Sequence, residues 1–280
     1  MTLALPSLQA LPAEHASRNA YKRAAADLVQ AIRAAPTWAA LAWHDVRQRY
    51  RRSLLGPLWI TLSMGITVAA LGFVYARLFG QTIDSYLPFV AIGFIVWGLV
   101  ASLVNEGCAA FISADSTIRQ VRLPLCFHVM RMMCRNLIVF AHNLLIYLVV
   151  LVVFPVSITA ALPLAIVGIG LVLANGLWLG VLLGMLSTRY RDVPQIIASV
   201  VQVAFFITPI VWQPNQLSRG ASGIVAWNPF YYFVEVVRAP LLGQVPALSV
   251  WMTCVAITLA GSAVSFVLFA RYRARIALWV

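Results

Sequence analysis

Long stretches without a charged residue constrain this chain more than any other feature of its sequence. The charge-free intervals are residues 57–76, 85–105, 136–188, 193–218 and 239–270. Each is long enough to supply the ~20 apolar residues that an α-helix needs to cross the hydrocarbon core of a membrane. Hydrophobic residues make up 62% of the chain and charged residues 10%, whereas a soluble domain carries roughly 25% charged residues. We therefore expect an all-α integral membrane protein.

One charge-free interval, 136–188, is too long for a single crossing, and Pro155 and Pro163 indicate a turn inside it. The last interval begins with a loop-like stretch, PLLGQVPALS, so its helix is expected to begin near Ser249. Six transmembrane helices result. We expect them at residues 57–79, 86–106, 129–153, 162–187, 194–213 and 249–270.

The positive charges predict the orientation of these helices. The chain has 20 Lys and Arg against 8 Asp and Glu, and an even number of spans places both termini on one side. If that side is the cytoplasm, all of these cations except Arg77, Arg219 and Arg238 lie in cytoplasmic segments or at inner helix ends. Because such segments are enriched in Lys and Arg, we expect cytoplasmic N- and C-termini. The cations form short clusters at the ends of apolar runs, so no nucleic-acid partner is expected.

The residues outside the spans form three further segments. Residues 1–36 are expected to be a cytoplasmic N-terminal segment, and residues 271–280 a cytoplasmic C-terminal tail. Residues 37–56 mix tryptophans with charged residues, which predicts an amphipathic interface helix along the membrane surface. A plain cytoplasmic helix is the alternative. The six-span membrane domain then covers residues 57–270.

The sequence argues against ATP hydrolysis or other chemistry within this chain. Its only lysine, Lys22, has no glycine nearby, so the phosphate-binding loop G-x-x-x-x-G-K-[ST] does not occur. No Ser/His/Asp set or carboxylate pair indicates a catalytic site, and the four cysteines lack metal-ligand spacing. We expect no catalytic residue, no metal and no cofactor in this chain, so a motor must be another protein.

The third predicted span begins with an unusual set of ionisable residues. His128, Arg131, Arg135 and His142 follow each other at spacings that place them along one stripe of a helix. One interpretation is a cationic entry for an anionic substrate. The alternative is that Arg131 or Arg135 pairs with Glu106 and that both arginines extend to the inner headgroups.

The segment between the last two spans, residues 214–247, is too long for a turn. It contains the aromatic stretch WNPFYYFVEVVRAPLLG and a possible ion pair of Glu235 with Arg238. One interpretation is a re-entrant or outer hairpin buried in protein, where its backbone polar groups can be satisfied. The other is an aromatic belt at the outer membrane interface.

Five stretches, taken in this order, carry a resemblance to a known family. They are RYRRSLLGPLWITLSMGITVAALGFVYARLFG, YLPFVAIGFIVWGLVASLVNEGC, STIRQVRLPLCFHVMRMMCRNLIVFAHNLLIYLVV, YRDVPQIIASVVQVAFFITPIVWQP and WNPFYYFVEVVRAPLLG. Over most of residues 45–245, the chain resembles the membrane subunits of type-2 ABC exporters for lipid-linked polysaccharide. These permeases export O-antigen, teichoic acid or capsule. The LVNEGC…FI…IRQVRLP version is more similar to the O-antigen branch of lipopolysaccharide biosynthesis than to the capsule branch.

The resemblance implies a homodimer with two copies of a separate nucleotide-binding ATPase, which would hold ATP and Mg. The cargo would be an undecaprenyl-diphosphate-linked polysaccharide, moved from the cytoplasmic to the outer side of the bacterial inner membrane. Export of capsule or teichoic acid is the alternative within the family. A gradient-driven transporter and a membrane enzyme of glycan assembly are the alternatives from other classes.

Two sets of residues are candidates for contact with such a lipid-linked glycan. Guanidinium groups suit bidentate contact with a diphosphate or with membrane lipid headgroups. The candidates are Arg49, Arg51, Arg52, Arg131 and Arg135. Aromatic rings can stack weakly on the apolar faces of sugars while a long chain slides past. These candidates are Phe73, Tyr75, Phe205, Phe206, Trp212, Phe230, Tyr231 and Tyr232. Helix packing or lipid contact is the alternative for each ring.

Contact with the ATPase is predicted for the cytoplasmic loops. The candidate coupling residues are Thr117, Ile118, Arg119, Arg122, Arg191 and Asp192. By resemblance, the interface helix at about Thr37–Tyr50 and a loop helix at Ser113–Val121 dock on the ATPase. The resemblance also implies short gate helices between spans five and six, at about Gln216–Leu242.

Overall fold

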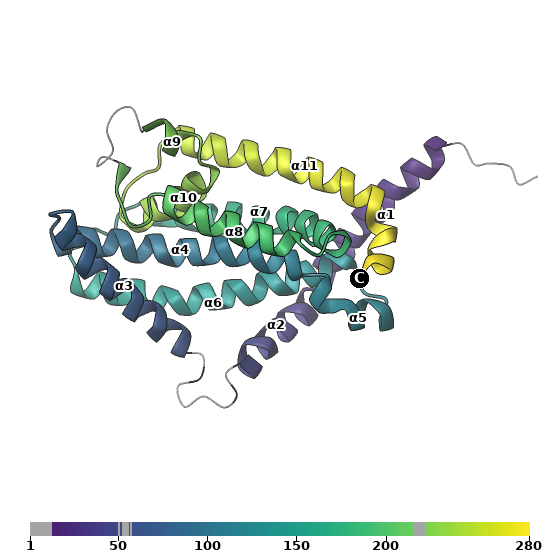
Figure 1. The fold of residues 1–280 in the computed structure, drawn as a ribbon, viewed down its shortest axis with the longest axis horizontal. Helices are drawn as coiled ribbons and strands as arrows, with labels where there is room; N and C mark the ends of the chain where they lie inside the picture. Colours follow the sequence, from purple (N-terminus) through teal and green to yellow (C-terminus); the bar gives the residue numbers. More distant parts are fainter. Residues whose placement is uncertain (1–12, 50, 52–55, 57, 215–221) are drawn as a thin grey trace, which may run out of the picture.

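A computed structural model gives the structure of the protein and describes residues 13–49, 51, 56, 58–214 and 222–280. Among these residues every regular element is helical, as expected for an all-α protein. The elements are α1 (Ala13–Arg33), α2 (Ala35–Arg49), α3 (Leu58–Leu78), α4 (Ile83–Ala109), η1 (Ile112–Ala114), α5 (Asp115–Gln120), α6 (Leu125–Val153), α7 (Leu162–Arg189), α8 (Val193–Ile207), α9 (Ser222–Ala226), α10 (Pro229–Leu241) and α11 (Leu248–Trp279). The long helices run along the long axis of the molecule (Figure 1).

Five of the described helices are long and apolar enough to cross a membrane, judged by length and composition. They are α3, α4, α6, α7 and α11, and they match the predicted spans 57–79, 86–106, 129–153, 162–187 and 249–270. The span predicted at 194–213 corresponds to α8, which has 15 residues and ends at Ile207. A helix of that length is about 22 Å long, shorter than the ~30 Å hydrocarbon core. The sixth crossing therefore stays a prediction.

Proline defines the start of three helices. Pro163, Pro194 and Pro229 lie in the first turn of α7, α8 and α10, where a backbone N–H would have no partner within the helix. The side chain of Asn228 caps α10 by accepting a hydrogen bond of 3.0 Å from the backbone N–H of Phe230. The turn predicted from prolines inside the longest charge-free interval lies between α6 and α7.

The central helix of the bundle is α4. It contacts α3, α6, α7, α8 and α10, and it is the most buried of the candidate spans. Glycines allow a close crossing with α7, because a Cβ on Gly107 would lie 3.0 Å from the Cα of Gly180. Small residues permit such backbone approach between membrane helices. The core is therefore built around α4 and α7.

The two ends of the bundle differ in chemistry. One end carries α1, α2, α5 and the last turns of α11 and holds most of the described arginines; we call it the basic end. The opposite end carries the α3–α4 and α6–α7 turns (Figure 1). This separation follows from the sequence, in which arginines cluster at alternate ends of the apolar runs.

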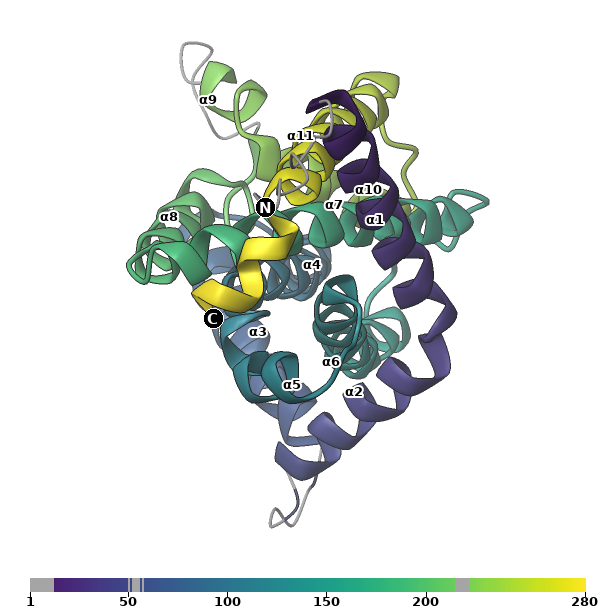
Figure 2. The ribbon, with the colours of Figure 1, turned by 90° about the vertical axis from the view of Figure 1, so that its right-hand side faces the viewer.

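The first two helices wrap around the side of α6, as Figure 2 shows in a view onto the basic end. α1 contacts α6 and α11, and α2 contacts α6. The predicted N-terminal segment 1–36 thus contains a helix that packs on the bundle. The predicted interface helix 37–56 corresponds to α2 up to Arg49, and residues 50 and 52–55 lie outside the described residues. Its position along a membrane surface stays a prediction.

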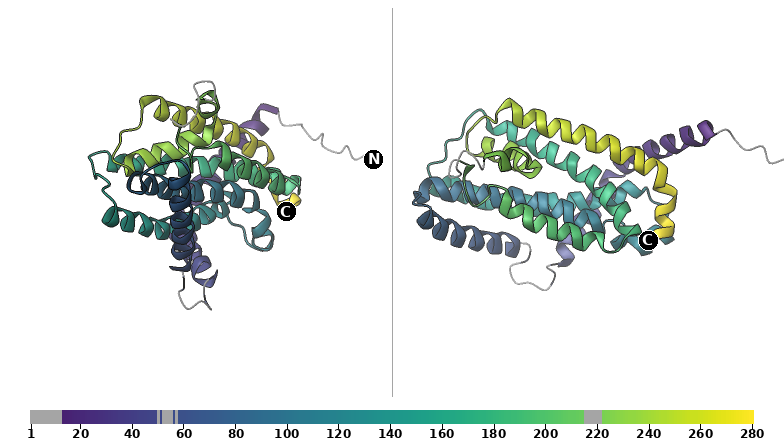
Figure 3. Two further views of the ribbon diagram at one scale, coloured as in Figure 1. Left: turned by 60° about the vertical axis from the view of Figure 1, so that its left-hand side comes forward. Right: turned by 45° about the horizontal axis from the view of Figure 1, so that its top comes forward.

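Between α8 and α11 the structure describes α9 and α10, whereas residues 216–221 of the predicted gate segment lie outside the described part. α10 contacts α4, α7 and α11, and most of its residues from Phe233 to Leu241 are buried. Figure 3 shows it enclosed by longer helices. α10 is thus packed in protein, whereas Trp227, which precedes it, is 90% exposed, so both interpretations of this segment stay predictions.

The last helix, α11, has 32 residues and ends at the basic end of the bundle (Figure 3). At 1.5 Å per residue it is about 48 Å long, more than a membrane core requires. Residues 271–279, predicted as a tail, continue this helix to Trp279. The end of α11 consequently projects among the loops of the basic end.

Candidate functional site

A polar cavity of about 340 Å³ lies at the basic end, between α2, α4, α6 and the η1–α5 segment. We call it the ionic cavity. Three of the predicted headgroup arginines line it, and so does Thr117, one of the predicted coupling residues. Its charged lining residues are Asp45, Arg49, Glu106, Arg131 and Arg135. The fold therefore brings two separately predicted sites to one place.

Two carboxylates neutralise the arginines of α6 in this cavity. Arg131 donates from Nε and Nη2 to the two oxygens of Asp45, at 2.9 and 2.5 Å, in a bidentate pair. Arg135 donates from Nη2 to Oε2 of Glu106 at 2.6 Å, and its Nη1 lies 3.6 Å from Asp45. Asn136 also donates to Glu106, at 2.9 Å. Asp45 thus joins α2 to α6, and Glu106 joins α4 to α6.

The third predicted span had two interpretations, a cationic entry for an anionic substrate or pairing of its arginines with Glu106. This geometry decides between them only in part. The pairing of Arg135 with Glu106 is confirmed. Arg131 pairs instead with Asp45, which sequence reasoning did not select as a partner. Because both guanidinium groups already have carboxylate partners, an incoming anion would have to compete with them. Arg49 and Arg51 are exposed at the end of α2, and Arg52 lies outside the described residues.

A second ionic contact, missed by sequence reasoning, holds α1 in place. The side chain of Asp27 is fully buried. It accepts hydrogen bonds from the backbone N–H groups of Leu125 and Cys126, at 3.1 and 2.9 Å, where α6 begins. Arg273 of α11 donates to it at 2.8 Å. A carboxylate is favourable at a helix N-terminus because the first N–H groups there lack partners. Asp27, an acid among the cations of this helix, was the available signal.

Two of the predicted coupling residues, Arg119 and Arg191, meet at the end of α11. Arg119 of α5 pairs with Asp115 and also donates to the backbone carbonyl of Val280. Arg191, in the α7–α8 turn, donates to the carbonyl of Trp279 at 3.4 Å. Two loops predicted to contact an ATPase are thus linked through the last turn of α11.

The other predicted coupling residues differ in their surroundings. Ile118 packs against the hydrophobic core, and Thr117 lines the ionic cavity. Arg122 and Asp192 are exposed. Arg122 and Asp192 are therefore more accessible than Thr117 and Ile118.

Two of the predicted channel aromatics belong to a partly buried aromatic cluster between α4, α8 and α10. Phe205 packs against Phe94 and Trp97, with ring centroids 5.5 and 5.8 Å apart. Phe230 packs edge-on against Trp97 at 5.6 Å. Such aromatic pairs add stability beyond the area they bury. Phe94 and Trp97, on the central helix, are members of this cluster that the sequence-based selection omitted.

The remaining predicted aromatics lie elsewhere. On α3, Arg77 lies 5.0 Å over the ring of Phe73. Phe206 is 68% exposed on α8 and its backbone carbonyl accepts a hydrogen bond from Trp212. Tyr75 of α3 packs against Phe79 in the turn after this helix, and Tyr231 packs against Tyr232 on α10. The eight rings do not form one continuous row within a single chain.

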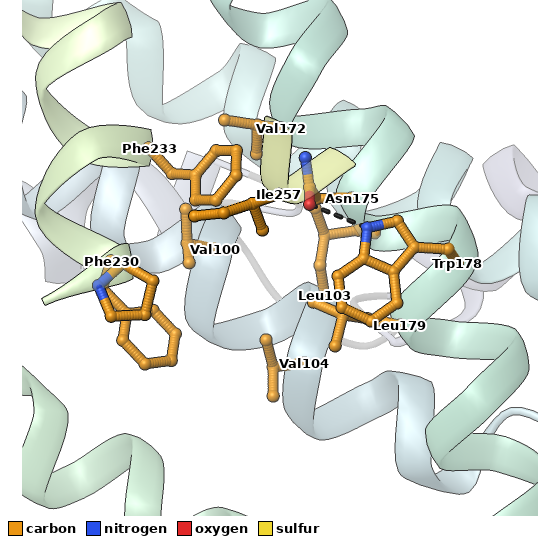
Figure 4. Close-up of a pocket in the computed structure, with 12 residues that line it drawn as sticks. Val100, Leu103, Val104, Val172, Asn175, Trp178, Leu179, Phe230, Phe233 and Ile257 are labelled. Atoms are coloured by element: carbon orange, nitrogen blue, oxygen red, sulfur yellow. Dashed lines mark hydrogen bonds between the residues drawn. The ribbon is translucent and has the colours of Figure 1, made fainter. Parts of the chain in front are cut away.

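An apolar cavity of about 180 Å³ lies between α4, α7, α10 and α11, and Phe230 is part of its wall (Figure 4). Its polar side chains bond to one another. Trp178 donates to Asn175 at 2.7 Å, as the dashed line in Figure 4 marks, and Asn175 donates to Thr258 at 2.6 Å. These hydrogen bonds leave a hydrophobic wall, so this cavity offers packing space rather than chemistry.

At the opposite end, the predicted ion pair of Glu235 with Arg238 is confirmed on α10. Arg238 is almost fully buried and donates from Nη1 to the carbonyl of Pro209 at 2.6 Å. Its guanidinium also lies 4.1 Å over the ring of Phe89. A buried arginine needs this many partners because an unpaired charge in an apolar interior is strongly unfavourable.

Comparison with known proteins places the chain in a family. Residues 37–242 match the family described as ABC-2 type transporter. The O-antigen export system permease protein RfbA of Myxococcus xanthus is 24% identical over 191 residues, which are 68% of this chain and 74% of that protein. RfbA of Klebsiella pneumoniae is 21% identical over 187 residues, 66% of this chain and 72% of that protein. With five apolar helices of spanning length and a family match over most of its length, this multi-pass membrane protein belongs to the ABC-2 type transporter family.

Proposed function

We propose that this chain is the permease subunit of an ABC transporter that exports O-antigen linked to undecaprenyl diphosphate. The match to the ABC-2 type transporter family carries the proposal. The cargo is taken from the names of the relatives, which are O-antigen export permeases. ATP hydrolysis takes place on a separate subunit in this proposal, and the permease provides the path from the cytoplasmic to the outer side of the bacterial inner membrane.

The proposed topology has six spans, with α8 as the fifth and the basic end in the cytoplasm. Residues 208–213 continue from α8 without helical structure toward the opposite end, and they extend the reach of this short helix. The concentration of arginines at the basic end supports its cytoplasmic position. α9 and α10, at the opposite end, take the place of the gate helices.

The proposed assembly is a homodimer with two ATPase subunits, which contact α2, α5 and the α7–α8 turn. The contacts around the ionic cavity support a mechanical connection between the ATPase-binding segments and the membrane helices. Thr117 lies at its wall, and Asp45 and Glu106 connect α2 and α4 to the arginines of α6. A displacement of α2 or α5 would therefore act directly on α4 and α6, since charge-assisted pairs resist separation.

In the proposed transport path, Arg49, Arg51 and Arg52 attract the diphosphate at the inner leaflet. Arg49 and Arg51 are exposed and in a position to do so. The exposed rings, Phe73 and Phe206, provide sliding contacts for the sugar chain.

A complementation experiment tests the proposal. A strain lacking this chain is expected to accumulate O-antigen inside the cell, and surface O-antigen should return when the chain is supplied together with its ATPase. A variant of the ATPase that cannot hydrolyse ATP should not restore export. Export that continues without any ATPase would instead favour a gradient-driven transporter. Loss of capsule or teichoic acid with normal O-antigen would move the assignment to that branch.

A further inference from the structure

A second cavity at the basic end, of about 410 Å³, lies between the last turns of α7 and α11. We call it the aromatic cavity. Its lining residues include Arg189, Tyr190, Tyr272, Arg275 and Trp279. We propose that this cavity binds the phosphate headgroup of an anionic membrane phospholipid, with Arg189 and Arg275 as the residues that contact the phosphate. The proposal does not depend on which cargo the transporter carries.

The charge of the aromatic cavity is not compensated by the protein. No Asp or Glu is among the described residues that line it. Within the part of the chain that the structure describes, neither guanidinium of Arg189 or Arg275 takes part in an ion pair or a side-chain hydrogen bond. Both groups therefore keep their N–H donors free for an anion, unlike Arg131 and Arg135 in the ionic cavity.

Aromatic rings hold these arginines in position. The guanidinium of Arg189 lies 5.9 Å from the ring centre of Tyr190 and 5.7 Å from that of Trp279. Arg275 lies 5.7 Å from the ring of Tyr272. Contact with an aromatic face leaves the N–H donors at the edge of the planar guanidinium available, and these donors match the geometry of a phosphate. The rings thus orient the two cations without neutralising them.

The remaining wall of the cavity suits a lipid better than a soluble anion. Leu182, Leu186 and Leu268 line it on the side of the membrane helices. Leu182 precedes Arg189 by seven residues, which is about 10 Å along a helix. A headgroup at the level of the arginines would consequently place its acyl chains beside the leucines. Basic pockets between membrane helices on the cytoplasmic side are known to bind anionic lipid headgroups.

A lipid in this position would connect the two predicted coupling loops. The rim of the aromatic cavity includes Trp279, whose backbone carbonyl accepts a hydrogen bond from Arg191 of the α7–α8 turn. The next residue, Val280, accepts one from Arg119 of α5. A phosphate that joins α7 to α11 would therefore fix the end of α11, against which both loops are held.

The test compares lipid binding to the purified full-length complex in neutral detergent. Phosphatidylglycerol is titrated, phosphatidylcholine serves as the uncharged lipid, and inorganic pyrophosphate serves as the free anion. Bound lipid is counted by native mass spectrometry, and the apparent Kd is taken from thermal stabilisation. Wild-type protein should bind phosphatidylglycerol selectively. The double variant Arg189→Gln/Arg275→Gln should bind it about 30-fold more weakly, because each cation near the membrane surface contributes about 5-fold.

A charge-matched control keeps the net charge of the variant but leaves the cavity intact. Arg23 and Arg33 are exposed on α1, so Arg23→Gln/Arg33→Gln should bind the lipid like the wild type. The variant Arg189→Lys/Arg275→Lys keeps the charge but loses the planar group, and intermediate affinity is expected. Equal weakening by the control and the cavity variant would overturn the proposal. Binding of pyrophosphate as tight as that of the lipid would overturn the assignment to a phospholipid.

Discussion

The two cavities at the basic end both contain arginines, but the groups that contact these arginines differ. In the ionic cavity, Arg131 and Arg135 are paired with Asp45 and Glu106, and each pair connects two helices. In the aromatic cavity, the arginines lie over rings of Tyr and Trp, and no carboxylate is among the described lining residues. The first arrangement stabilises the fold, and the second leaves charge available to a ligand.

The number of arginines in a cavity therefore does not identify an anion site in such a protein. The site is identified by the group with which each guanidinium is paired. A carboxylate partner uses the donors of the arginine and cancels its charge. An aromatic partner leaves both in place. The comparison predicts that removing a partnered charge lowers stability in proportion to its burial, whereas removing an unpartnered one changes stability little.

The largest effect is expected at Arg238, which is 2% exposed and lies at the opposite end. Arg238→Met should lower the free energy of unfolding by about 4 kcal/mol, because it leaves Glu235 and the carbonyl of Pro209 without their donor. Unfolding of the purified protein in SDS measures this. Glu235→Gln removes one acceptor and should cost less. Full stability of Arg238→Met would contradict the rule for partnered charges.

The next largest effect is expected at Asp27. Asp27→Ala should lower the free energy of unfolding by about 3 kcal/mol. The substitution leaves two backbone N–H groups at the start of α6 and the guanidinium of Arg273 without their acceptor. The loss should include early exchange of backbone amides in α1, which hydrogen–deuterium exchange detects. Arg23→Ala, which removes an exposed charge from the same helix, is the control. An unchanged exchange rate in α1 would show that this carboxylate does not hold the helix.

A smaller effect is expected in the ionic cavity, where the side chains are partly exposed. Asp45→Asn should cost about 1–2 kcal/mol, because Arg131 loses its bidentate partner while water still reaches the pair. The exchange Asp45→Arg/Arg131→Asp should recover part of this loss in thermal unfolding. A double exchange no better than the sum of the single variants would show that the contact itself does not matter.

The smallest effect on stability is expected in the aromatic cavity. In a neutral detergent without anionic lipid, Arg189→Gln/Arg275→Gln should change the free energy of unfolding by less than about 1 kcal/mol, since exposed cation–π contacts contribute little. Addition of phosphatidylglycerol should then stabilise the wild type but not this variant. A large loss of stability without lipid would place these arginines with the partnered ones and end the distinction between the cavities.

Much of the fold could be predicted from the sequence. The helices α3 and α7 begin and end within two residues of their predicted spans, and the loop helix predicted at Ser113–Val121 is present as η1 and α5. Other boundaries were less accurate: α4 and α6 begin three to four residues early, and α11 extends nine residues past its predicted end. The hydrophobic pattern locates a span, but polar residues can continue the helix beyond it.

The candidate site was predictable only as a list of residues. Arg131 and Arg135 were selected for headgroup contact and Thr117 for ATPase coupling, and the structure brings all three to the same cavity. Asp27 and Asp45 were missed as partners. No local pattern distinguishes an acid that pairs across helices from one that faces water, because the pairing depends on which helices pack together.

The sequence by itself determined that this chain is a bundle of apolar helices with its arginines concentrated at one end. Both properties follow from local composition, since the length of an apolar run and the charges beside it set how a segment sits in a membrane. Only the tertiary structure decided which arginines meet carboxylates and which meet aromatic rings. Those contacts join residues as far apart as Asp27 and Arg273, and they exist only after the helices have packed.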